Sequence, residues 1–228
     1  MVEFKYGGQT VIVVNKNLQN DIPNLEKIRK ILPSNPTIVD CGANYGNHTI
    51  YYVKFMNAKK VYVFEPIKKI YNVMLEVLNI NKIDNVDVYN MGVSAKHEEI
   101  QLVSMIPENK GSFAFWYKGE EIEKKPYEMG FKKHIDANYL IAHSVPLDDM
   151  INEKIDFIKI DVEGMEMEVL KGAKRLINEY SPLILIEVWG RNKTNKQKLK
   201  KWMEKNNYIS AMGMTGPNHL IKEARRRK

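Results

Sequence analysis

Short apolar runs rich in β-branched residues alternate with amphipathic segments along most of the chain. The apolar runs are typical of buried strands, and the segments between them carry apolar residues at helical spacing. This alternation predicts an α/β, Rossmann-like fold, in which helices cover both faces of a doubly wound, mostly parallel sheet. The predicted strands are 37–40, 61–65, 85–90, 156–161 and 183–187, and the predicted helices are about 46–57, 67–81 and 165–180.

One interval departs from the alternation. Between about residues 97 and 146 the sequence offers strand-like pieces and a charged stretch in place of a crossover helix. A connection of this length is unusual in α/β proteins, where a few residues suffice. We therefore predict a β-rich insertion between the third and fourth core strands. Its aromatic residues favour a substrate cap and a β-extension with its own small core about equally.

The remaining parts of the chain complete the predicted organisation. Residues 1–36 form a lead-in, with a short strand or hairpin followed by a turn and a helix over Ile22–Leu32. Residues 37–222 form the main domain, and residues 223–228 form a basic tail. We expect one domain with an insertion, because 228 residues suit a single α/β unit.

Composition and charge narrow the possible partners. Hydrophobic residues make up 44% of the chain and charged residues 28%, as in ordinary globular proteins. Residues 191–228 carry 12 Lys or Arg against 2 Asp or Glu, so this end has a net charge of +10 and the remainder −3. Such an end can bind nucleic acid, anionic glycan or membrane phosphate, and it can equally be a solvated helix and tail.

Three further features of the sequence predict a cytoplasmic protein. No apolar run approaches the roughly 18–20 residues that span a bilayer. The N-terminal residues lack the basic and then apolar pattern of a signal peptide. The chain has one cysteine, Cys41, so it has no intrachain disulfide, and we expect Cys41 to serve packing only.

Four predicted strands end in an acidic residue: Asp40, Glu65, Asp161 and Glu187. In open α/β sheets, ligands bind at the carboxyl ends of the strands. The four acids would therefore form an electronegative rim over the ligand site. This rim disfavours a ligand whose phosphates rest there and favours one that carries positive charge.

The loop CGANYGNHT follows Asp40. It lacks the lysine of a phosphate-binding GxxxxGK[ST] loop and the spacing of a dinucleotide-binding GxGxxG loop. Gly42 and Ala43 let a ligand approach the backbone closely. Asp40 suits an ammonium group, and Glu65 is placed to hold the two hydroxyls of a ribose. S-adenosylmethionine, a cationic amino acid joined to adenosine, satisfies both acids.

Six segments occur in order over about residues 37–190: VDCGANYGNHT, VYVFEP, NVDVYNMGVS, VPLDD, IDFIKIDVEGMEMEVLKGA and SPLILIEVW. Together they resemble the FkbM-type methyltransferases, a class I group that depends on S-adenosylmethionine. The resemblance implies a seven-stranded sheet with one antiparallel strand, to which NYISAMGM and NHLIKEA contribute the last two strands. It also implies methyl transfer to a hydroxyl oxygen of a sugar, a glycan or another natural product.

The resemblance also implies a cofactor site. The ribose would meet Glu65 and Pro66, the adenine would lie near Asn90, and Asp161 would lie beside the cofactor. Tyr45 and Thr49 would line the same pocket. The residues implied at the methionine end are Asp40, Gly42, Ala43, Asn44 and Gly46.

Transfer to an alcohol benefits from a base that removes the hydroxyl proton, typically by about 10²–10⁴-fold. The stretch KIDVEGME offers Asp161, Glu163 and Glu166 for this role, with helix capping as the alternative for the glutamates. Lys159 shares a face with Asp161 in a strand that is expected to be buried on both sides, where a lysine needs a partner. We expect that partner among Asp40, Asp161 and Glu187. Lys159 would either orient the reacting groups or fix the strand register.

Other residues support weaker alternatives. Asp161 and Glu187 could together bind a divalent cation, but two carboxylates are only half a site, and no metal is expected. Trp116 and Tyr117 could stack on a sugar or a base. The histidines considered as further bases are His134, His143 and His219, of which His219 could reach the cleft.

Two other functions compete with the leading one. In the first, the acceptor is an RNA ribose 2′-hydroxyl and the basic C-terminal region binds the RNA. Lys159, Asp161, Lys174 and Glu187 supply the residue types of a Lys-Asp-Lys-Glu set, but Lys159 lies in the fourth strand instead of near the N-terminus. In the second, the chain binds the cofactor without catalysis, and the intact series of acids argues against this.

Overall fold

The computed structural model describes residues 1–104, 113–116, 139–188, 193–214 and 218–224. Within these ranges, one sheet has seven strands in the order β12-β13-β11-β10-β3-β4-β5. β13 runs antiparallel to both of its neighbours, and the other strands are parallel to one another. The predicted fold is confirmed. The strands are β3 (Thr37–Cys41), β4 (Lys60–Phe64), β5 (Val86–Tyr89), β10 (Phe157–Ile160), β11 (Leu183–Glu187), β12 (Tyr208–Met212) and β13 (Asn218–Glu223).

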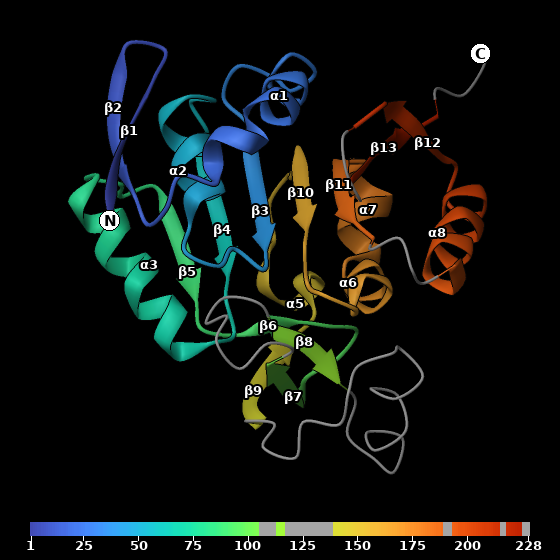
Figure 1. Cartoon of the computed structure of the whole chain (residues 1–228). Coiled ribbons are helices and arrows are strands. Elements are labelled where there is room, and N and C mark those ends of the chain that lie inside the picture. The colour runs from blue at the N-terminus through green and yellow to red at the C-terminus, as the bar shows by residue number, and fades with distance from the viewer. Residues whose placement is uncertain (105–112, 117–138, 189–192, 215–217, 225–228) are drawn as a thin grey trace.

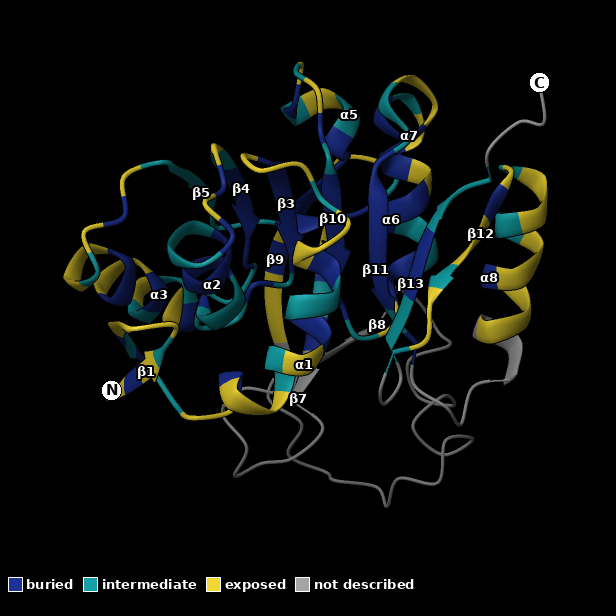
Figure 2. Cartoon of the chain, turned by 90° about the horizontal axis from the view of Figure 1, so that it is seen from above, coloured by how far each residue is buried: buried dark blue, intermediate teal, exposed yellow. Residues whose placement is uncertain are grey.

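Helices cover both faces of this sheet (Figure 1). One face packs against α1, α2, α3 and the hairpin of β1 and β2, and the other packs against α5 to α8. Figure 2 shows the central strands as buried and the outer side of α8 as exposed. The elements are β1 (Val2–Tyr6), β2 (Gln9–Val13), α1 (Leu18–Arg29), α2 (Asn47–Lys54), α3 (Lys68–Ile80), α5 (Leu147–Met150), α6 (Glu166–Gly172), α7 (Lys174–Tyr180) and α8 (Lys193–Lys205).

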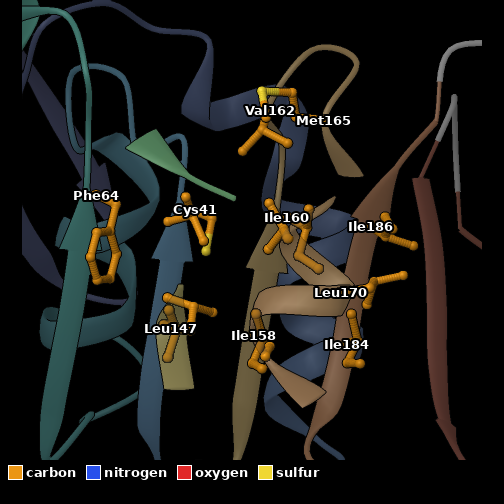
Figure 3. Packing of buried hydrophobic residues seen from close by; sticks show 14 of the residues in the cluster. Cys41, Phe64, Leu147, Ile158, Ile160, Val162, Met165, Leu170, Ile184 and Ile186 are labelled. Atoms are coloured by element: carbon orange, nitrogen blue, oxygen red, sulfur yellow. The ribbon is translucent and has the colours of Figure 1, made fainter. Parts of the chain in front are cut away.

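The central strands alternate their side chains between the two cores. Ile158 and Ile160 of β10 enter the core under α6 and α7, as Figure 3 shows, whereas Phe157 enters the opposite core. Lys159 therefore points to the same side as Phe157 and is 5% exposed. In the parallel register, Lys159 lies opposite Asp40 of β3.

The insertion forms a second sheet, with described strands in the order β6-β9-β7-β8. Figure 1 shows this sheet beyond the carboxyl ends of the central strands. Ile100, Leu102 and Ala142 are buried and belong to the hydrophobic core that the main sheet forms with α5, α6 and α7. The described strands thus extend the main core. Their bounds are β6 (Gly92–Val93), β7 (Glu98–Ser104), β8 (Phe113–Trp116) and β9 (Tyr139–Val145).

Two helices differ from the sequence prediction. α1 begins at Leu18, four residues before the predicted start at Ile22, and contains Pro23. This proline removes an N–H that would bond to the carbonyl of Gln19, an exposed residue whose carbonyl water can reach. The helix predicted over 165–180 is divided into α6 and α7. It breaks beside Gly172, where a Cβ would lie 2.0 Å from the carbonyl oxygen of Ser94.

Within the described ranges, no helix combines the length and the apolar character needed to cross a bilayer.

Candidate functional site

A cleft of about 590 Å³, counting the open space at its mouth, lies at the carboxyl ends of β3, β4 and β10. One part of its wall is apolar, and Leu102 of the inserted sheet contributes to that part. The described lining residues include three acids and no Lys, Arg or His. The lining residues are Gly42, Asn44, Phe64, Glu65, Pro66, Ile67, Ile70, Gly92, Val93, Leu102, Asp161, Val162 and Glu163.

The glycine loop after β3 is held tightly against its neighbours. The N–H groups of Gly42 and Ala43 both donate to the carbonyl oxygen of Phe64, at 3.0 and 3.1 Å. Gly42 has φ +78°, and a Cβ there would lie 1.9 Å from the carbonyl oxygen of Asp161. Gly46 also has positive φ and directly precedes α2, as its N-cap residue. Gly42 therefore allows the loop after β3 to approach the end of β10 closely at the cleft.

Beneath this loop, Lys159 joins two of the predicted acids. Its Nζ lies 3.4 Å from Asp40 Oδ1 and 3.1 Å from Asp161 Oδ2, and it donates to the Gly42 carbonyl at 3.2 Å. Two of the carboxylates expected as partners of Lys159, those of Asp40 and Asp161, thus lie within ion-pair distance. Burial acts to lower the pKa of Lys159, but Asp161 and Asp40 outweigh it and hold the pKa above its ordinary value.

Asp40 itself is fully buried and does not line the cleft. Thr49 of α2 donates its hydroxyl to Asp40 Oδ2 at 2.8 Å, and Lys159 faces Oδ1. Ala43 is buried beside it, and Tyr45 is half-buried in the loop. Asp40 and Thr49 therefore support the loop from below, while Gly42 and Asn44 present the loop to the cleft.

Glu65, at the end of β4, is 4% exposed and faces the cleft. Its two carboxylate oxygens accept hydrogen bonds from the N–H groups of Asn44, at 2.9 Å, and Ile67, at 2.8 Å. Burial raises the pKa of Glu65 to about 7, although these two bonds act to lower it. Asn90 donates its amide to the carbonyl oxygens of Glu65 and Pro66, at 2.9 and 3.0 Å. Glu65 and Asn90 thus fix the two loops that border the cleft.

The turn after β10 brings two more acids to the cleft. Asp161 and Glu163 both line it, and burial raises the pKa of Glu163 to about 7, with Asp161 and Glu166 adding to the effect. Glu163 has φ +51°, a backbone conformation that is uncommon outside glycine. Glu166 is buried at the first residue of α6.

Glu187 ends β11 beside this turn. Burial and the charge of Asp161, opposed by Lys159, raise the pKa of Glu187 to about 7. His219 is half-buried on β13, and burial lowers its pKa. Lys174 is exposed at the start of α7.

The other residues considered from the sequence either lie away from the cleft or fall outside the described residues. Cys41 is buried in the apolar core under the sheet, consistent with packing. His143 is exposed on β9. Tyr117 and His134 lie outside the described residues, as does the Trp116 side chain. Within the described ranges, no three His, Cys, Asp or Glu side chains are grouped as metal ligands would be.

The N-terminal lead-in contributes residues that sequence reasoning missed. Asp21 of α1 pairs with His48 of α2 at 3.0 Å. Asn47 donates its side-chain amide to Asn15 at 3.1 Å. These contacts fasten the start of α1 to the helix that follows the glycine loop. They join residues 27 and 32 positions apart, and no local pattern in the sequence indicates them.

The strand order, with its single antiparallel strand, and the acidic cleft at the carboxyl ends define a Rossmann-like methyltransferase. The chain belongs to the FkbM methyltransferase family, because the model of the Methyltransferase FkbM domain matches residues 40–210. The family predicted from the six sequence segments is confirmed, and the chain is an S-adenosylmethionine-dependent methyltransferase of this type.

Individual relatives agree with this assignment. The chain is 30% identical over 176 residues to Methyltransferase sdnD of Sordaria araneosa, with 69% of this chain and 68% of that protein covered. It is 26% identical over 156 residues to Methyltransferase 1 of Beauveria bassiana, with 61% and 59% covered.

Two solved structures show the same fold. Methyltransferase FkbM from Methylobacillus flagellatus aligns with a TM-score of 0.56 at 20% identity, over 83% of this chain and 44% of that chain. A putative methyltransferase from Streptococcus mutans in complex with SAH aligns with a TM-score of 0.51 at 12% identity, over 88% and 94%. The chain thus spans less than half of the M. flagellatus protein.

Proposed function

We propose that the protein transfers the methyl group of S-adenosylmethionine to a hydroxyl oxygen of a sugar, a glycan or another natural product, with Glu163 as the base. The observation that carries the proposal is the position of Glu163. It lies in the same cleft as Gly42 and Glu65, and its pKa is raised to about 7 by burial, Asp161 and Glu166.

The cleft has the chemistry that this cofactor requires. Its apolar wall, which includes Phe64, Ile67 and Leu102, suits an adenine ring. Glu65 at its edge suits ribose hydroxyls, and Asp161 adds negative charge for the cationic end. When bound, the cofactor supplies a methyl group on a sulfonium, which is an excellent leaving group. The loop from Gly42 to Gly46 would hold the methionine end, with Asp40 supporting this loop from the buried side. Asn90 would act by fixing the loop beside the adenine.

A base for an alcohol works best when its pKa lies near the working pH. Glu163 and Glu187 both meet this condition, since the pKa of each is raised to about 7, chiefly by burial. Glu163 lines the cleft and Glu187 does not, so Glu163 is the residue that would accept the hydroxyl proton. Asp161, held by Lys159 at 3.1 Å, would orient the acceptor.

The charge of the cleft bears on the choice of acceptor. Three acids and no basic side chain line its described wall, which opposes a phosphate at the reacting position. This disfavours an RNA backbone there and favours an uncharged hydroxyl compound. Several lysines of α8 are exposed. Figure 1 shows α8 at the far edge of the sheet, beside β12. Methylation of RNA is therefore the alternative result that the experiment must be able to detect.

The test incubates the purified protein with methyl-labelled S-adenosylmethionine and a whole-cell extract, and divides the products by RNase digestion. We expect label that resists RNase and follows carbohydrate or small-molecule fractions. Glu163→Gln should lower this incorporation by at least about 10²-fold, because it removes the base. Glu168→Gln on α6, which removes a charge paired with Lys171, serves as the control.

Two results would contradict the proposal. Label released by RNase would make RNA the acceptor. Tight binding of S-adenosylmethionine with no incorporation in any fraction would favour a binding module without catalysis.

A further inference from the structure

Glu166 is a buried acid whose place in the reaction has not been assigned. It is the first residue of α6 and is 4% exposed. Its Oε1 accepts a hydrogen bond from the N–H of Gly164 at 2.6 Å. A carboxylate at this depth needs a definite partner. Here the partners are the Gly164 N–H, in the turn that leads from β10 into α6, and the backbone N–H of Glu166 itself.

That turn has an uncommon backbone conformation. Glu163 has φ +51° and Gly164 has φ +121°. A glutamate with positive φ is strained and persists only where surrounding contacts hold it. The hydrogen bond to Glu166 falls on the next residue, Gly164, so it restrains the turn at the point where the strain is located.

We propose that Glu166 is a positioning residue that holds the Glu163–Gly164 turn and so directs the Glu163 carboxylate into the cleft. Glu166 does not line the cleft and has no part in bond making. Its importance for catalysis rests on the proposed role of Glu163 as the base. The alternative is that Glu166 only stabilises the first turn of α6 through the helix dipole.

The titration of Glu163 distinguishes these two roles. Burial raises its pKa most, Asp161 and Glu166 raise it further, and Lys159 lowers it. Glu187 also interacts electrostatically with Glu163. Loss of the Glu166 charge should lower the pKa of Glu163 in either role. Loss of the hydrogen bond to Gly164 should lower it further only if Glu166 holds the turn.

The titration can be followed without knowing the acceptor. Protein labelled with ¹³C at the glutamate carboxyl carbons is titrated by NMR, and the Glu163 signal is assigned by its loss in Glu163→Gln. In the unaltered protein we expect a midpoint near 7. Glu166→Gln keeps an oxygen for Gly164 but removes the charge, so the midpoint should fall by on the order of half a pH unit.

Glu166→Ala removes the bond as well as the charge. The turn can then relax and expose Glu163 to water, and the midpoint should fall further, toward the ordinary glutamate value. Glu168→Gln, which removes a partly exposed carboxylate from the same helix, should leave the midpoint unchanged. Should Glu166→Ala fail to fold, Glu166→Asn, which is also uncharged but has a side chain too short to keep the bond to Gly164, takes its place.

A Glu163 midpoint that is no lower in Glu166→Ala than in Glu166→Gln would overturn the positioning role. The base role fails independently. If Glu163→Gln retains full methyl transfer while the Glu166 variants still move the Glu163 titration, then Glu166 positions Glu163 but Glu163 is not the base.

Discussion

Replacement of Lys159 by Met tests how the buried charges under the glycine loop are held. Lys159 Nζ lies 3.4 Å from Asp40, which is fully buried, and 3.1 Å from Asp161, whose side chain is 29% exposed. At an effective dielectric constant of about 20, a pair at this distance interacts by about 5 kcal/mol. Water can compensate Asp161 in the variant, whereas Asp40 keeps only the Thr49 hydroxyl. We therefore expect a loss of about 3–5 kcal/mol in the free energy of unfolding.

The assay is urea unfolding followed by circular dichroism, with a check for two-state behaviour. Adding Asp40→Asn to Lys159→Met removes the unpaired charge, so the double variant should recover much of the lost stability. Lys154→Met is the matched control, since it breaks an exposed pair with Asp156 at 2.7 Å and should cost about 1 kcal/mol or less. A cost below about 1 kcal/mol for Lys159→Met, or a double variant no better than the single one, would refute the reasoning.

Two further variants test the loop and the cleft. Gly42→Ala should lower the free energy of unfolding by at least about 2 kcal/mol more than Gly8→Ala does, as measured by chemical unfolding. Both glycines have φ +78°, but only at Gly42 would the added Cβ meet a backbone atom, at 1.9 Å. Equal losses of stability in the two variants would contradict the steric argument. Burial raises the pKa of Glu65 from 4.5 to about 7 in the folded protein. Its contribution to stability therefore falls as pH rises from about 4.5 to 7. Glu65→Gln should accordingly lower the difference in Tm between pH 5 and pH 8, and an unchanged difference would contradict the raised pKa.

Much of the fold could be predicted from the sequence, because strands buried on both faces and amphipathic helices leave strong periodic patterns. The acids at four strand ends indicated the place of the ligand site, because the topology fixes where the carboxyl ends of parallel strands meet. The interpretation of Lys159 as a paired buried lysine followed from strand alternation and is confirmed by its contacts with Asp40 and Asp161.

Other features depend on contacts that no local pattern encodes. The pairing of Asp21 with His48 requires knowing how α1 lies against α2. Asp40 was expected to face the ligand, and the structure instead buries it beneath the loop, because the lysine opposite it in β10 neutralises it there. The division between α6 and α7 lies beside Gly172, whose close approach to Ser94 only the tertiary structure reveals.

The most direct test of the central claim is calorimetric titration of S-adenosylhomocysteine into the purified protein. We expect one site per chain, with affinity lowered at least about tenfold in Glu65→Ala, because that variant removes the carboxylate proposed to hold the ribose and frees the Asn44 and Ile67 loops. Glu168→Gln should bind as the unaltered protein does. Absence of binding, or equal binding by Glu65→Ala, would show that the cofactor does not occupy this cleft.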